Sequence, residues 1–150
     1  MYLKTMATLA VLASAGFASA ESISPQQVSF TDGAVPQSLT GEPGNPAEGR
    51  EVFANRKLGN CLACHANEDL AEQAFHGQIG PMLDGVGDRW SEAELRAIVV
   101  NAKEVFEGTI MPAFYNARTI NRPLKGFEDK TILSAQQVED LVAYLMLLKE

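Results

Sequence analysis

The only two cysteines of the chain and one of its two histidines stand within five residues of each other. Cys61, Cys64 and His65 form the run Cys-x-x-Cys-His. This is the pattern of c-type haem attachment, in which two thiols add to the haem vinyl groups and the next side chain reaches the iron. We therefore predict one covalently attached haem c, with Cys61 and Cys64 as its anchors and His65 as an axial ligand of the iron.

Two other chemistries use closely spaced cysteines. Cys-x-x-Cys is also the spacing of thiol redox enzymes, whose cysteines alternate between thiol and disulfide. A structural zinc site would need two further ligands. Besides His65 only His76 could serve, and it lacks the usual paired-histidine spacing. We favour haem over both alternatives, because the haem pattern accounts for all three residues at once.

The second axial ligand of the iron has to come from elsewhere in the chain. Besides the lysines, the candidates are Met82, Met111, Met146 and His76. Met111 lies in an irregular segment, residues 104–133, directly before Pro112. A loop can carry a thioether across to the far face of the haem more easily than a helix can. We therefore predict Met111 as the sixth ligand, with His76 as the main alternative, since methionine and histidine are the usual second ligands in cytochromes.

The N-terminus has the features of a secretory signal peptide. Residues 1–20 carry one lysine, a short apolar run and an Ala-Ser-Ala cleavage site. The run is short for a membrane-spanning helix of about 20 residues, so we expect cleavage before Glu21. A mature chain of 130 residues is the size of one domain. We therefore predict that the protein is periplasmic. Two thiols in an exported protein would often form a disulfide, but they need not do so if they hold a haem.

The net charge of the chain limits the classes of partner that it is expected to bind. The full sequence has 12 basic and 19 acidic side chains, and loss of the signal peptide removes one lysine and leaves a net charge of −8. This balance argues against nucleic acid or an anionic membrane surface as a partner.

An extended N-terminal arm precedes the predicted domain. Residues 21–44 are rich in proline and glycine and contain five scattered apolar side chains: Ile23, Val28, Phe30, Val35 and Leu39. This composition fits a disordered arm and fits equally a strap that packs on its own domain or on another chain. From the number of apolar side chains we expect the arm to strengthen association with a partner chain.

The remaining residues, 45–150, are predicted to form one all-α domain. The first helix starts at the cap Asn45 and continues through residues 46–59. Capping boxes mark the other two helices, with Ser91 paired to Glu94 and Ser134 paired to Gln137. Residues 66–80 are predicted to form a loop. A glycine inside the first helix, Gly49, predicts close approach by another helix.

Four motifs resemble the class I c-type cytochromes across roughly residues 46–149. They are AEGREVFANRKLGNCLACH, IGPML, IMPAFY and EDLVAYLMLLK. The resemblance implies helices wrapped around one haem, with the Pro81 carbonyl accepting the Nδ1 proton of His65. It also implies that Gly49 and Phe53 cross the last helix near Tyr144.

A narrower resemblance is to the SoxX family, the monohaem subunits of SoxAX complexes in thiosulfate oxidation. The runs GDRWSEAELRAIVVNAK and TIMPAFY carry most of it, and Met82 departs from the expected small residue or proline. It implies a heterodimer with a SoxA-like cytochrome. The heterodimer would be an L-cysteine S-thiosulfotransferase, which couples thiosulfate to a cysteine of a SoxYZ-like carrier. This chain would accept the electrons and pass them to a downstream acceptor.

The residues themselves agree with such a division of labour. With both axial positions filled and both thiols bound to haem, the chain has no group left for covalent sulfur chemistry, so we predict no catalytic residue in it. The alternative is a free-standing electron-shuttle cytochrome. Arg89 and Trp90 are weaker candidates for a hydrogen bond to a haem propionate, and Tyr115 for packing near Met111.

Overall fold

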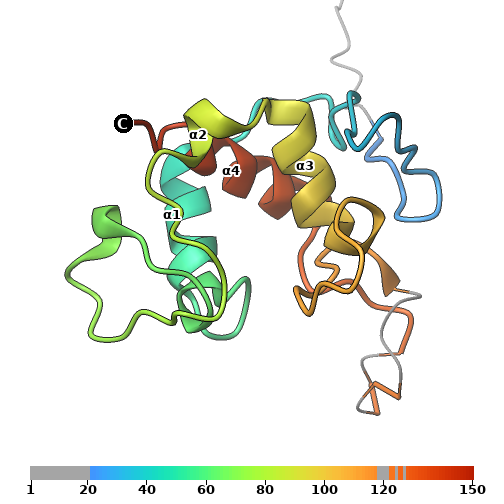
Figure 1. Ribbon diagram of the computed structural model, residues 1–150. Helices are drawn as coiled ribbons and strands as arrows, with labels where there is room; N and C mark the ends of the chain where they lie inside the picture. Colours follow the sequence, from blue (N-terminus) through green and yellow to red (C-terminus); the bar gives the residue numbers. More distant parts are fainter. Residues whose placement is uncertain (1–20, 118–121, 124, 127) are drawn as a thin grey trace, which may run out of the picture.

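The computed structural model describes residues 21–117, 122–123, 125–126 and 128–150 (Figure 1). The helices of this part of the chain are not accompanied by any strand, so the predicted all-α class is confirmed. None of its helices is long and apolar enough to cross a membrane. The predicted signal peptide, residues 1–20, lies outside the described residues.

Two helices from opposite ends of the domain cross and form its centre (Figure 1). They are α1 (Pro46–Ala54) and α4 (Ala135–Leu145). At the crossing, a Cβ atom on Gly49 would lie 1.9 Å from the carbonyl oxygen of Asp140. One turn later the rings of Phe53 and Tyr144 meet edge to face, with centroids 5.6 Å apart. The contact predicted for Gly49 and Phe53 is therefore confirmed, and glycine is what allows the backbones to touch.

The first helix is shorter than the sequence analysis predicted. It begins as expected, with the Asn45 side chain accepting the Ala47 N–H, but it ends at Ala54. The next residue, Asn55, is extended, and its side chain accepts the Lys57 N–H at 2.9 Å. Asparagine side chains that bond to nearby backbone compete with helix formation, so residues 55–60 form turns instead.

The two predicted capping boxes are both present. Ser91 begins α3 (Glu92–Asn101), and Ser134 begins α4, each with reciprocal side-chain bonds to the residue three positions on. Short helices that we did not predict lie between the main ones: η1 (Cys61–Ala63), η2 (Glu68–Leu70), α2 (Val86–Arg89) and η3 (Ala102–Glu104). Each is at most four residues long, which is too short to show a helical period.

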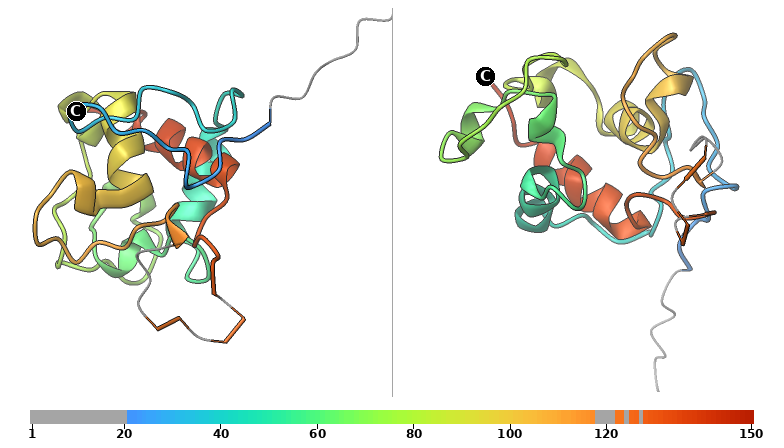
Figure 2. Two further views of the ribbon diagram at one scale, coloured as in Figure 1. Left: turned by 90° about the vertical axis from the view of Figure 1, so that its right-hand side faces the viewer. Right: turned by 90° about the horizontal axis from the view of Figure 1, so that it is seen from below.

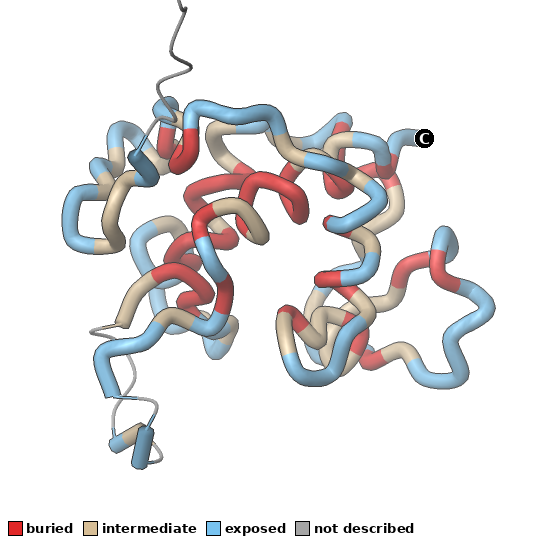
Figure 3. Tube along the Cα trace, turned by 180° about the vertical axis from the view of Figure 1, so that it is seen from behind, coloured by how far each residue is buried: buried red, intermediate tan, exposed pale blue. Residues whose placement is uncertain are grey.

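The buried core runs through the crossing helices and α3 (Figure 3). Its largest fully buried apolar side chains are Phe53, Leu39, Leu70, Leu133 and Leu141. Leu39 belongs to the N-terminal arm, which therefore contributes to the core rather than merely covering it.

The arm packs on its own domain, along the side that carries α3 (Figure 2). Val35 and Leu39 are buried, and the Val35 N–H donates to the Ala93 carbonyl at 2.9 Å. Arg96 of α3 donates to the Val35 carbonyl at 3.0 Å. Two of the five apolar side chains of the arm, Val35 and Leu39, are thus buried inside this chain, whereas Ile23, Val28 and Phe30 are only partly buried. A role of the arm in association with a partner stays a prediction.

Candidate haem-binding site

His65 follows η1, and its ring is held from the loop that returns beneath it. The Nδ1 atom lies 2.7 Å from the carbonyl oxygen of Pro81. Because a carbonyl can only accept, this contact places the ring proton on Nδ1 and leaves the Nε2 lone pair for a metal. The hydrogen bond from Nδ1 to this carbonyl also raises the basicity of Nε2, the nitrogen that would bind the metal.

Two glycines allow the loop of residues 66–83 to lie against the cysteine motif. A Cβ atom on Gly80 would lie 2.3 Å from Cε1 of His65, and one on Gly77 would lie 2.1 Å from the Ala63 carbonyl oxygen. The backbone N–H of Gly80 donates to the Cys64 carbonyl at 2.8 Å. The imidazole therefore rests on backbone that leaves no room for a side chain.

The two cysteines are free thiols and are partly exposed. Burial raises the pKa of the Cys61 thiol to about 12, which is opposite to the lowered pKa of reactive redox thiols. No group of three or more histidine, cysteine, aspartate or glutamate side chains in the described part of the chain is placed to hold a metal ion. The raised pKa of the Cys61 thiol does not favour the thiol redox alternative.

Met111 lies on the segment that follows η3, residues 105–117, here called the methionine segment. In Figure 1 this segment (orange) and the loop of residues 66–83 (green) lie on opposite sides of the domain. Its side chain is partly buried against the core. Beyond it, the N–H groups of Phe114 and Tyr115 donate to the Val99 and Val100 carbonyls of α3 at 3.2 and 3.1 Å. The end of the methionine segment is thereby fixed to a helix.

The other candidate ligands are placed differently. Both ring nitrogens of His76 have partners in the loop that follows His65, namely the Asn67 N–H at 3.3 Å and the Leu70 carbonyl at 3.0 Å. Met82 follows Pro81 directly and is 55% exposed. Met146 ends α4, beside Gly87 of α2. Of the four candidates, Met111 is the one carried by the segment opposite His65.

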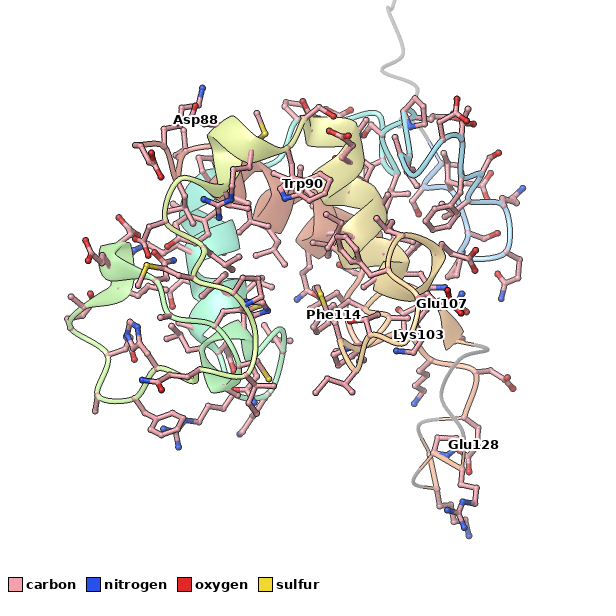
Figure 4. The ribbon with its side chains drawn as sticks, viewed as in Figure 1. Asp88, Trp90, Lys103, Glu107, Phe114 and Glu128 are labelled. Atoms are coloured by element: carbon pink, nitrogen blue, oxygen red, sulfur yellow. The ribbon has the colours of Figure 1, made fainter. Side chains whose placement is uncertain are left out.

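Arg89 is the last residue of α2, and Trp90 follows it as the C-cap. The Arg89 guanidinium donates to the carbonyls of Asp84 and Met82 at 2.6 and 3.1 Å. The Trp90 ring, labelled in Figure 4, meets the Phe106 ring edge to face, with ring centroids 5.9 Å apart. A propionate contact for either residue stays a prediction. Tyr115 uses its hydroxyl to donate to the Ile23 carbonyl at 2.7 Å.

A polar network that the sequence analysis missed connects the His65 loop to the crossing helices. The Tyr144 hydroxyl donates to Asp69 at 2.7 Å and accepts from the Asn67 side chain at 2.8 Å. Arg50 of α1 donates to the same Asp69 carboxylate at 2.9 Å. Hydrogen bonds from Tyr144 and then from Arg50 lower the pKa of Asp69. Nothing in the helical pattern around Tyr144 marks this role.

The residues that are present fit a covalently bound haem. Two free thiols stand one turn apart, and the imidazole beside them has its Nδ1 proton bound and its Nε2 available. The residue that lies against that imidazole is a glycine, Gly80. The Met111 side chain, on the methionine segment, is partly buried against the core. A soft sulfur ligand opposite an imidazole suits an iron that changes oxidation state without binding substrate.

Comparisons with known proteins agree with this arrangement. The cytochrome c family model matches residues 46–149. A chain in the crystal structure of SoxXA from P. pantotrophus is 51% identical, with a TM-score of 0.80. The match covers 86% of this chain and 99% of that one. No curated protein matches the sequence significantly.

Proposed function

The chain belongs to the cytochrome c family as a SoxX-like electron-transfer subunit with one covalent haem c, and from this premise we propose that it is the electron-accepting half of a SoxXA-type heterodimer. The partner in this proposal is a SoxA-like cytochrome. It is supported by the 51% identity to a chain of a SoxXA structure over nearly the whole of that chain.

Within this proposal each site residue has one task. Cys61 and Cys64 would hold the haem covalently, and His65 and Met111 would bind its iron. The Pro81 carbonyl orients His65 and keeps its Nδ1 protonated. The haem, when bound, supplies one-electron transfer. The single observation that supports the role of His65 is the 2.7 Å contact between its Nδ1 and the Pro81 carbonyl, which leaves Nε2 available for iron.

The same assignments leave the thiosulfate chemistry to the partner. This chain has no cysteine beyond Cys61 and Cys64, and both would be used in holding the haem. The chain therefore handles electrons, while a SoxA-like subunit couples thiosulfate to the cysteine of a SoxYZ-like carrier. This chain would accept the electrons from the partner and pass them to a downstream acceptor. The N-terminal sequence supports export to the periplasm as the place where this happens.

The ligand assignment is tested by spectroscopy on the ferric protein. Sulfur ligation gives a weak near-infrared charge-transfer band, which Met111→Ala should remove and Met82→Ala should leave in place. A band that survives in Met111→Ala but is lost in Met82→Ala would assign the ligand to Met82. Its absence from the wild type would favour His76 or a lysine. Acid–organic extraction should leave the haem on the protein, and extractable haem would contradict thioether attachment.

The partner assignment is tested by purification and by a coupling assay. The native protein should co-purify with a second, larger cytochrome. Thiosulfate coupling to the carrier should then be measured with this subunit alone, the partner alone and both together, using the natural electron acceptor. We expect full activity only with both. A monomer that never binds the partner, or full activity without this subunit, would instead indicate a free-standing shuttle.

A further inference from the structure

Lys103 is placed beside the methionine segment by the way α3 ends. Asn101, the last residue of α3, is buried, and its side chain accepts the Lys103 N–H at 3.3 Å. The same residue is the cap of η3 (Ala102–Glu104). The chain therefore turns into a short 3₁₀ helix whose middle residue is a lysine.

The ammonium group of Lys103 is directed at backbone carbonyls of that segment. Its Nζ donates to the Met111 carbonyl at 2.8 Å and to the Thr109 carbonyl at 3.3 Å. Among the described residues it has no carboxylate partner within ion-pair distance. A surface lysine usually remains solvated or pairs with an acid. Here the donors go to the two carbonyls that flank Ile110.

The part of the segment just before Met111 has few contacts of its own. Gly108 has a positive φ of 75° and would have no neighbour within 4 Å of an added Cβ, and Ile110 is 77% exposed. The Met111 N–H donates to the Thr109 hydroxyl at 3.2 Å, which is a bond within the segment itself. In the described part of the chain, Lys103 is the only group outside the segment that donates to these carbonyls.

We propose that Lys103 is a positioning residue that holds the Met111 backbone so that the thioether stays on the iron. The inference rests on the proposed role of Met111 as sixth ligand. Methionine has three rotatable bonds and adapts readily, so a persistent iron–sulfur bond depends on a fixed backbone. Hydrogen bonds from a charged donor are stronger than neutral ones. The measurable consequence is the rate at which Met111 leaves the iron.

That rate can be measured by the binding of imidazole to the ferric holoprotein, because an external ligand enters only when the methionine has left. The limiting rate at high imidazole should rise about tenfold in Lys103→Met, the change expected for loss of one charge-assisted hydrogen bond. Lys103→Arg retains donors and charge and should restore a rate close to that of the wild type. The matched control is Lys149→Met, which removes the same charge from an exposed site near the C-terminus.

Equal limiting rates in Lys103→Met and the wild type would overturn the proposal. So would an equal increase in Lys149→Met, because net charge rather than contact would then be responsible. If Lys103→Met does not retain haem, Lys103→Gln takes its place and is read by the same two criteria. Failure of the ligand assignment is seen separately: the near-infrared band would survive in Met111→Ala, and this inference would fall with it.

Discussion

The hydroxyl of Tyr115 donates a 2.7 Å hydrogen bond to the carbonyl of Ile23. It joins the start of the N-terminal arm to a residue four positions after Met111. Ile23 in turn donates its N–H to the Leu39 carbonyl at 2.7 Å, and Leu39 is fully buried. The arm and the methionine segment are therefore parts of one packed unit.

Tyr115→Phe should lower the free energy of unfolding of the holoprotein by about 1 kcal/mol, because the Ile23 carbonyl loses its donor while the ring still fills its place. Denaturant titration of the ferric protein measures this. Phe30→Leu, a change on the arm in which no hydrogen bond is lost, serves as the control. An unchanged unfolding curve for Tyr115→Phe would mean that the contact contributes nothing to stability.

The buried pair of Arg96 and Glu139 should be the most sensitive polar contact of the domain. Both side chains are less than 5% exposed, and their atoms lie 2.9 Å apart. Glu139→Leu should cost about 3 to 5 kcal/mol of unfolding free energy, because it leaves Arg96 buried without this partner. Glu92→Gln, which alters the other, exposed carboxylate on Arg96, should cost less than about 1 kcal/mol. Similar losses of unfolding free energy in the two variants would contradict the expectation that the buried pair is the more sensitive contact.

Gly80→Ala should disturb the axial histidine. The added Cβ would lie 2.3 Å from the His65 ring, and Gly80 is not among the glycines with positive φ, so crowding alone is tested. We expect Gly80→Ala to lower the free energy of unfolding by about 1 to 3 kcal/mol. In the ferrous protein that also carries Met111→Ala, where the iron is five-coordinate, we expect Gly80→Ala to lower the iron–imidazole stretching frequency in the Raman spectrum. The exposed neighbour, altered in Gln78→Ala, is the control. An unshifted frequency would show that the ring is not held by this contact.

Acid should weaken the Tyr144–Asp69–Arg50 network. The pKa of Asp69 is lowered by hydrogen bonds from Tyr144 and Arg50. A carboxylate with a lowered folded-state pKa stabilises the fold above its unfolded pKa of about 3.9, and the stabilisation is lost as pH falls through the folded pKa. Below about pH 4 the wild type should therefore lose stability more steeply than Asp69→Asn. Glu51→Gln, at an exposed site on α1, should follow the wild type, and parallel curves for all three proteins would refute the expectation.

The sequence predicted the elements whose determinants are local. Ser91 with Glu94 and Ser134 with Gln137 marked two helix starts correctly, because a capping box lies within four residues. The end of α1 was missed, because it depends on how the Asn55 side chain bonds to the Lys57 N–H. The arm was left open, because composition alone does not show where Val35 and Leu39 are buried.

In the candidate site, too, the features with local determinants could be predicted and those that depend on distant contacts could not. The attachment motif is contiguous and could be recognised in the sequence, and family resemblance led to the Pro81 contact. Lys103 could not be found, because its partners depend on how α3 ends at Asn101. The role of Tyr144 depends on a residue 75 positions away in the chain, and no periodic pattern encodes such a pairing.

The contact between Gly49 and Asp140 closes a long loop of the chain. It joins segments that are far apart in the sequence, and every residue proposed to hold the haem, from Cys61 to Met111, lies on the stretch between them. Closing such a loop costs conformational entropy, and the contact between α1 and α4 offsets that cost for the whole stretch at once. A single helix crossing therefore closes the part of the chain that carries all the proposed haem residues.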